Sequence, residues 1–100
     1  MPIFPLRLEK TYFEKGFFNV TVDFDKYVRP TNGQIELLLI ANGRQHRVDG
    51  SVNRNANRNH TARIMGTTKL RDWFMTYFAI GAQVDVHLLS PHLMRLEKRP

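Results

Sequence analysis

The sequence predicts a mainly β, α+β fold in which six or seven short strands and two helices form one closed or nearly closed barrel. Several segments alternate apolar and polar residues with a period of two, which is typical of half-buried strands. Only one long segment has the periodicity of an amphipathic helix. The chain has 100 residues, enough for one hydrophobic core, and closure of the sheet would remove its exposed edges. We therefore expect residues 1–100 to form a single domain.

The strands near the N-terminus are predicted from their alternation. The segment LRLE at residues 6–9 alternates apolar and polar residues. The segment NVTVDF at residues 19–24 does the same, and it would place Val20, Val22 and Phe24 on one face. Both segments are therefore expected to be half-buried strands.

The other strands follow further along the chain. Residues 35–40, IELLLI, are apolar apart from Glu36, which indicates a strand covered on both faces. QVDVHLL at residues 83–89 alternates regularly, whereas residues 44–52 and 92–98 are less regular strand candidates.

The helix is predicted by five residues at i, i+3, i+4, i+7 and i+8, which form one apolar stripe: Leu70, Trp73, Phe74, Tyr77 and Phe78. Thr67 or Thr68 can cap its start, and Gly81 can end it. A shorter helical turn is expected to begin at residues 23–25 and to stop before Pro30. Asp23 and Asp25 lie at the start of this turn, so capping explains them better than a metal site does.

The charge of the chain is strongly basic and local. Its formal net charge is +6 with a pI near 10.2, and ten of its fifteen basic residues are arginine. Residues 44–71 contain seven basic residues and one acid, Asp49, and seven minus one equals the excess of the whole chain. Such a concentration is typical of nucleic-acid binding, although a solvated basic surface explains the charge equally well.

No catalytic or cofactor site is predicted. The histidines at positions 46, 60, 87 and 92 lack metal-ligand spacing, and His46 and His87 occupy outward positions of the strand pattern. The serines lack a nucleophile-elbow context, and the glycines are isolated. The chain has no cysteine, which excludes disulfides and thiolate zinc sites and favours a cytosolic protein. No apolar run approaches the ~20 residues that span a bilayer, and the start does not resemble a secretion signal.

Two segments are not explained by a core. Residues 53–63, NRNANRNHTAR, are nearly all Asn and Arg. Arg pairs with guanine and Asn with adenine in the major groove of duplex DNA, and both also bind phosphates. A flexible polar loop remains the alternative, since Asn is also a common turn former.

The second segment, KTYFEKGFFNV at residues 10–20, has a turn at residues 14–16 between two aromatic pairs. Tyr12, Phe13 and Phe17 would form a stacking platform for single-stranded bases in one interpretation. In the favoured interpretation, Phe13, Phe18 or both belong to the core and hold a short projecting loop. The contacts to a ligand would then come from other parts of that loop, namely Lys10, Lys15 and the backbone of Gly16.

Five motifs occur in a recognisable order: KTYFEKGFFNVTVDF, QIELLLI, NRNANRNHTARIMG, LRDWF and QVDVHLLSP. Together, from Leu6 to Leu96, they resemble the B-three-type DNA-binding pseudobarrel of plant transcription factors and bacterial restriction endonucleases. The bacterial form is the more similar. This resemblance implies a seven-stranded open pseudobarrel with two short helices, which grips duplex DNA with two arms in the major groove.

The resemblance also implies the binding residues. We define the N-arm as residues 10–17 and the C-arm as residues 53–63. The N-arm candidates are Lys10, Thr11, Tyr12, Glu14, Lys15 and Gly16, where Glu14 would accept a hydrogen bond from cytosine. The C-arm candidates are Asn53, Arg54, Asn55, Asn57, Arg58, Asn59, His60 and Arg63. The base-edge readers among them are expected to be Asn55, Asn57 and Arg58, with Arg54 and Asn59 as further candidates, while Arg63 braces the arm or binds a phosphate.

The sequence departs from the family at residues 81–83, Gly-Ala-Gln, where a Gly-Asp pair is expected. It also contains no nuclease domain. The predicted function is sequence-specific binding of double-stranded DNA by a monomeric domain without catalysis of its own. This domain would be the target-recognition part of a restriction endonuclease, fused to or associated with a nuclease domain, in a bacterial cytosol near the nucleoid. Three alternatives stay open: a single-stranded DNA or RNA binder that uses aromatic stacking, a protein-interaction domain, and a small nuclease.

Overall fold

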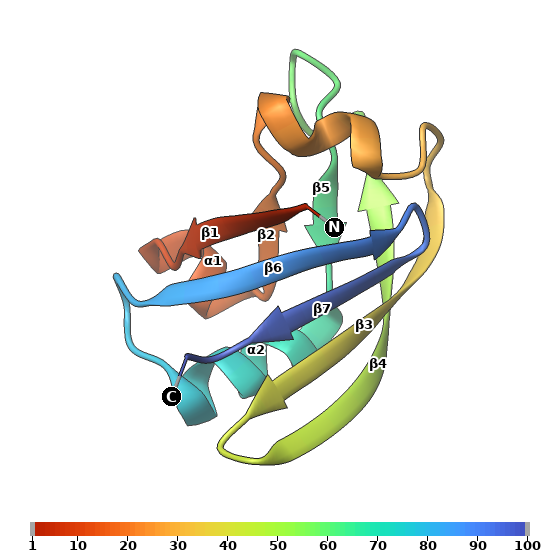
Figure 1. Ribbon diagram of the computed structural model, residues 1–100. Coiled ribbons are helices and arrows are strands. Elements are labelled where there is room, and N and C mark those ends of the chain that lie inside the picture. The colour runs from red at the N-terminus through yellow and green to blue at the C-terminus, as the bar shows by residue number, and fades with distance from the viewer. Residues whose placement is uncertain (1, 100) are drawn as a thin grey trace.

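One seven-stranded mixed sheet curls into an open half-barrel in the computed structural model, which describes residues 2–99 (Figure 1). The strand order is β1-β6-β7-β3-β4-β5-β2, and all neighbours are antiparallel except β3 and β7. The strands are β1 (Ile3–Arg7), β2 (Phe17–Asn19), β3 (Gly33–Ala41), β4 (Arg44–Asn53), β5 (Arg63–Met65), β6 (Gln83–Ser90) and β7 (Leu93–Glu97). The helices are α1 (Lys10–Lys15), the 3-10 helix η1 (Val22–Tyr27) and α2 (Thr67–Tyr77). The predicted fold class is confirmed, with one more helix than expected.

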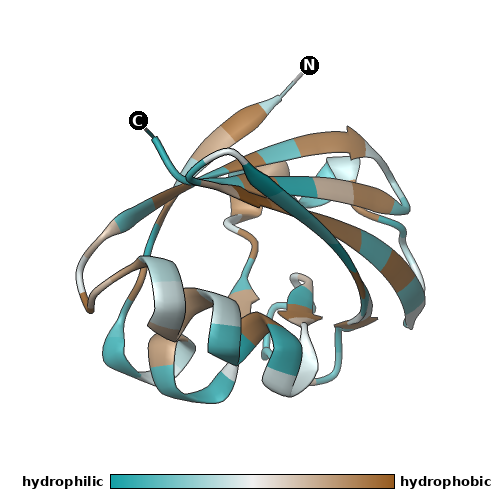
Figure 2. Ribbon diagram, turned by 90° about the horizontal axis from the view of Figure 1, so that it is seen from below, coloured by the Kyte–Doolittle hydropathy of each residue, from teal (hydrophilic) through white to brown (hydrophobic). Residues whose placement is uncertain are grey.

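The core fills the concave side of the sheet, and α2 covers that side. Apolar residues alternate along the strands, so that brown and teal alternate on the ribbon where it arches over α2 (Figure 2). From α2 itself, Leu70, Trp73 and Phe74 are buried against the sheet. The apolar stripe that predicted this helix is therefore the face that packs on the barrel.

Several predicted elements are confirmed with shifted ends. The strands expected at residues 44–52, 83–89 and 92–98 form as β4, β6 and β7. The first strand lies a few residues earlier than the LRLE motif. The helix begins after Gly66 rather than at a threonine cap, and it ends at Tyr77, before Gly81.

Two strand predictions are wrong in part. In the segment predicted as a strand at residues 19–24, the strand ends at Asn19 and η1 follows, so the face shared by three residues does not form. Val20 is buried, but Val22 is 68% exposed. In β3 the inward residues are buried, whereas Leu38 and Ile40 on the outer face are only half-buried. Within residues 2–99 no helix or second sheet covers this face (Figure 1), and β3 is not the doubly covered strand that its sequence indicated.

Candidate nucleic-acid interface

The two predicted arms occupy the connections on either side of the short β2–β5 pair. The C-arm leaves the end of β4 and returns at the start of β5, and its loop protrudes beyond the sheet beside η1 (Figure 1). The N-arm lies between β1 and β2, but it is the helix α1 and not the expected loop. Lys and Glu favour a helix here, and Gly16 ends it in the left-handed conformation, at φ 75°.

Gly16 fixes the N-arm against α2. Its N–H donates to the carbonyl oxygen of Tyr12 at 2.9 Å, and its own carbonyl accepts from the N–H of Gly66 at 3.0 Å. A Cβ at this position would lie 2.5 Å from the carbonyl oxygen of Thr67. The backbone of Gly16 is therefore bonded within the protein and does not offer the ligand contact that the sequence suggested.

The aromatic residues of the N-arm hold it in place. Phe18 is fully buried, as the favoured interpretation expected, and Tyr12 and Phe13 pack against the core while partly exposed. The ring of Tyr12 meets the ring of Phe17 edge-on, with centroids 5.5 Å apart. The guanidinium of Arg63 lies 4.5 Å from the Phe17 centroid. Because neighbouring groups contact these rings, they do not form an open stacking platform.

The exposed part of the N-arm is polar. Lys10, Thr11, Glu14 and Lys15 project from α1 into solvent. No hydrogen bond joins these side chains to any residue from 2 to 99. They are available to a ligand.

Arg54 anchors the base of the C-arm. Its Nη1 donates to Oδ2 of Asp25 at 2.8 Å and to the carbonyl oxygen of His60 at 2.9 Å. Its Nε and Nη2 donate to the carbonyl oxygen of Arg29 at 3.1 and 2.8 Å. The side chains of Arg54 and Asp25 are only 13% and 24% exposed. Since all three guanidinium nitrogens are bonded, Arg54 is not free to read a base in this conformation.

Asp25 has a different role from the helix capping that the sequence suggested. Besides pairing with Arg54, its Oδ1 accepts from the N–H of Ala62 at 2.8 Å, and none of the described side chains caps the start of η1. Asn32 adds a second contact at the start of the arm, because its Oδ1 accepts from the N–H of Arg54 at 2.7 Å. The carboxylate of Asp25 thus joins both ends of the arm's base, and the amide of Asn32 supports the first end.

Two of the C-arm asparagines form turns. Oδ1 of Asn53 accepts from the N–H of Asn55 at 2.9 Å. Oδ1 of Asn59 accepts from both the N–H and the hydroxyl of Thr61, at 3.2 and 2.8 Å. Asn53 and Asn59 are therefore explained as turn formers, the alternative that the sequence had left open.

Asn57 and Arg63 brace the arm against β2. The amide nitrogen of Asn57 donates to Oδ1 of Asn19 at 2.9 Å and to the carbonyl oxygen of Thr61 at 3.2 Å. Arg63 donates from Nε to the same Asn19 oxygen at 3.1 Å. Together with the Arg63–Phe17 contact, these bonds join the C-arm to the N-arm across the outer face of β2 and β5.

The tip of the C-arm is left free. Asn55, Arg58 and His60 are exposed, and within the described chain their side chains form no hydrogen bond. Beside the tip lies a shallow pocket lined by Asn19, Asn57, Arg58, Asn59 and Thr61. The loop therefore combines a braced base with a polar and basic tip.

The basic charge of residues 44–71 is less concentrated than the sequence indicated. Arg47, Arg54 and Arg71 form ion pairs with Glu36, Asp25 and Asp72. The four remaining basic residues are spread over β4, the C-arm, β5 and α2: Arg44, Arg58, Arg63 and Lys69. Of these, Arg58 and Arg63 belong to the C-arm.

The histidines match the expectation only in part. His46 is exposed, as expected, but it lies on the inward face of β4, in line with Val48, and lines a groove against α2. His87 points outward, but its side chain is only 12% exposed and lies 3.3 Å from Glu97. Among residues 2–99 no His, Asp and Glu side chains cluster as a set of metal ligands.

Sequence reasoning missed the residues that brace the C-arm: Asn19, Asp25, Asn32 and Thr61. They lie up to 44 residues from their partners in the chain, and no local pattern marks them. Asp25 was noticed, but its neighbourhood in the sequence pointed to a helix start. Only the folded chain brings it to Arg54.

Among the comparisons with known proteins, similarity appears at the level of structure. No protein-family model matches the chain, and no curated protein sequence matches it. A solved structure, the N-terminal domain of Helicobacter pylori LlaJI.R1, is similar with a TM-score of 0.64 and 10% sequence identity. The similarity covers 97% of this chain and 79% of that one. None of the described helices is long and apolar enough to cross a membrane.

Proposed function

We propose that this chain is a sequence-specific double-stranded DNA-binding module of the B-three pseudobarrel type, acting in restriction–modification. The observation that carries the proposal is the C-arm, whose base is held by Arg54 while Asn55, Arg58 and His60 remain free at its tip. A reading loop needs this combination, because a preorganised arm loses little conformational entropy when it enters a groove. The half-barrel fold shared with the LlaJI.R1 domain is consistent with the proposal.

The residues divide into readers and braces. In this proposal Arg58 and Asn55 read base edges in the major groove, and His60 contacts a base or a phosphate. Arg54, Asn57 and Arg63 position the arm, and Asn53 and Asn59 shape its turns. This assignment revises the sequence-based one, in which Asn57 was a reader and Arg54 and Asn59 were further candidates.

The N-arm contributes from α1. Lys10 and Lys15 neutralise phosphates, and Thr11 and Glu14 lie on the same exposed helix, where Glu14 can accept from cytosine. Tyr12 and Gly16 keep the helix in place. A monomer without its own catalysis, joined to or associated with a nuclease domain, would deliver that nuclease to its site.

Single-stranded binding by stacking is less well supported. Tyr12, Phe13 and Phe17 are the candidate platform, and all three are packed against other side chains. A base would have to displace Arg63 from Phe17 before stacking on it.

The test is selection from a randomised duplex library at about 0.1 M salt, where non-specific attraction to phosphates is weaker than at low salt. We expect one short motif to be enriched. Arg58→Ala should cost about 1–3 kcal/mol, selectively at one base position. The matched control is Arg44→Ala, since Arg44 is also exposed but lies at the other end of β4.

Salt dependence separates the two kinds of contact. If roughly 5 phosphates are neutralised, the slope of log K against log salt should be about −4 to −5. Arg58→Ala should relax the preference at one base position while it leaves the salt slope almost unchanged. Binding without enrichment, with equal affinity for single strands, would contradict the proposal and reduce the C-arm to a charged surface.

A further inference from the structure

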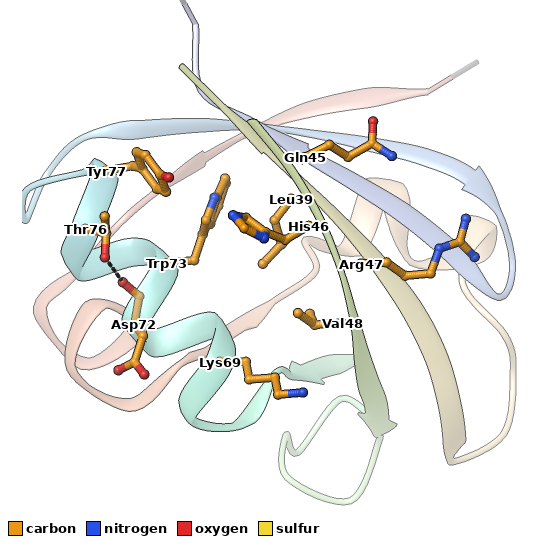
Figure 3. Close-up of a pocket in the computed structure, with 10 residues that line it drawn as sticks. All are labelled: Leu39, Gln45, His46, Arg47, Val48, Lys69, Asp72, Trp73, Thr76 and Tyr77. Atoms are coloured by element: carbon orange, nitrogen blue, oxygen red, sulfur yellow. Dashed lines mark hydrogen bonds between the residues drawn. The ribbon is translucent and has the colours of Figure 1, made fainter. Parts of the chain in front are cut away.

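A second candidate site lies at the other end of β4, in a groove of about 580 Å³ between β4 and α2. Figure 3 shows α2 on one side of this groove and β4 on the other, with Trp73 and His46 between them. β4 has ten residues, and an extended strand of this length spans about 30 Å. The C-arm begins where β4 ends, so the groove lies apart from the C-arm (Figure 1).

One edge of β4 is open along this groove. On one side, β3 pairs with β4 over its length, from Arg44 to Val52. On the other side, β5 pairs only with Ser51, Val52 and Asn53. No further backbone hydrogen bond within the described chain involves residues 44–49. Their outward N–H and C=O groups can therefore pair with an added strand.

The groove beside this edge is lined by apolar side chains and contains one hydrogen-bond donor without a partner among the described residues. Leu39, Val48 and Trp73 are buried there, and Tyr77 is half-buried. Trp73 is 4% exposed, and its indole Nε1 is buried without a hydrogen-bond partner among residues 2–99. Buried donors of this kind are nearly always bonded, so an acceptor that enters the groove would complete the site.

The charge at the rim selects the ligand. Lys69 lines the groove and Arg44 lies at the start of the open edge, and neither forms an ion pair with a described residue. The acid of the groove, Asp72, is already paired with Arg71. The unbalanced charge is therefore positive and favours an acidic ligand.

We propose that this groove binds an extended acidic peptide segment of a partner protein, by strand addition to β4. The peptide backbone pairs with residues 44–49, and alternate apolar side chains pack over Leu39, Val48 and Trp73. A carbonyl or carboxylate of the peptide accepts from the Trp73 indole, and its acids face Lys69 and Arg44. Duplex DNA has the right charge, but it has neither the extended backbone nor the apolar side chains that this site requires.

The first experiment selects about eight-residue peptides from a displayed random library, a length that spans the open edge. We expect enrichment of acidic sequences with alternating apolar residues. The chain contains one tryptophan, so the single indole N–H resonance reports on the groove. It should shift downfield on binding, together with the amides of residues 44–49.

The second experiment uses variants that do not touch the core. Thr76 and Met75 are both exposed on α2, but only Thr76 lines the groove. Thr76→Arg should weaken peptide binding by about tenfold or more, or roughly 1.4 kcal/mol, whereas Met75→Arg should not. Methylation of alternate amide nitrogens in the peptide should abolish binding, because only strand addition needs those donors.

Three results would overturn the proposal. The first is a peptide selection on the parent chain that enriches no more than the same selection on Thr76→Arg. The second is enriched peptides that shift the amide resonances of the two arms and not those of the groove. The third is a Trp73 indole resonance that shifts when duplex DNA is added but not when peptide is added. DNA selection with Thr76→Arg keeps the two proposals distinct, since the groove variant should retain the DNA preference of the parent chain.

Discussion

The two arms are attached to the same half-barrel by different kinds of interaction. α1 packs through Tyr12 and Phe13, and Gly16 lets its end approach α2 closely. The C-arm reaches the core only through the small side chain of Ala62 among the described apolar residues, and its base is held mainly by Arg54 and its polar partners. An arm held by packing cannot change shape without disturbing the core. An arm held at its base by polar bonds can carry different residues at its tip while the base keeps the arm in the same position.

The largest effect is expected from breaking the polar anchor. Arg54→Ala leaves Asp25 without its cation and the carbonyl oxygens of Arg29 and His60 without their donor. We expect the free energy of unfolding to fall by about 3 kcal/mol, the lower end for a buried pair, because both side chains are partly exposed. Denaturant unfolding measures this loss.

The matched control is Arg58→Ala, an arginine on the same loop whose side chain forms no internal bond. Its effect on stability should stay within about 0.5 kcal/mol. Equal losses for the two variants would show that the C-arm is not held at its base.

The packing of the N-arm is tested by Gly16→Ala. The new Cβ would meet the carbonyl oxygen of Thr67 and the N–H of Arg71, at 2.5 and 2.8 Å. We expect a loss of about 2 kcal/mol in the free energy of unfolding, from overpacking and from the left-handed backbone. Hydrogen exchange should show that α1 becomes less protected.

Gly43→Ala separates the two causes. Gly43 has nearly the same φ, 76°, but no other atom of residues 2–99 lies within 4 Å of an added Cβ. This variant should cost about 1 kcal/mol from backbone strain alone. If both variants lose the same stability, the close contact between α1 and α2 is not tight.

A smaller effect is expected where the two arms meet. Arg63 lies over the ring of Phe17, and its guanidinium also bonds Asn19. A double-mutant cycle with Phe17→Leu and Arg63→Gln should give a coupling of about 0.5–1 kcal/mol in unfolding free energy. Zero coupling would mean that the arms are positioned independently of each other.

The same contrast explains what the sequence predicted and what it did not. Strand alternation and the α2 stripe depend on side chains that are close in the chain, so β4, β6, β7 and α2 were predicted near their true positions. The short strands β2 and β5 have three residues each, too few for a period to be visible. The helix α1 was hidden because its aromatic pairs suggested a turn.

The sequence predicted which segment forms the candidate site, but not which of its residues are free and which hold the arm in place. Composition alone marked residues 53–63 as polar and basic. Which of them are free depends on Asp25, Asn19 and Asn32, which come from η1, β2 and the loop before β3. Arg54 and Arg58 are four residues apart and equivalent in the sequence. Only the fold makes one an anchor and leaves the other at the tip.

The smallest effect is expected from an ion pair outside both arms, which shows what burial adds to the Arg54–Asp25 pair. Arg99 donates to Asp85 at 2.7 Å, but its side chain is 69% exposed. The hydrogen bond from Arg99 is the main cause that holds the pKa of Asp85 below its ordinary value of 3.8. Because the folded-state pKa is lowered, the contribution to stability is present above pH 3.8 and is lost as the pH falls through the folded-state pKa.

Arg99→Ala should therefore raise the pKa of Asp85 towards 3.8. The chemical shift of the Asp85 carboxyl carbon in an NMR titration measures this change. The unfolding free energy at neutral pH should change little, since the Arg99 side of this pair is exposed and its charge is screened by solvent and salt, although Asp85 is only 15% exposed. The same arginine-to-alanine change at position 54 removes a pair that is mostly shielded from solvent. A loss at position 99 as large as the one at position 54 would mean that burial does not distinguish the two pairs. The braced base of the C-arm would then need another explanation.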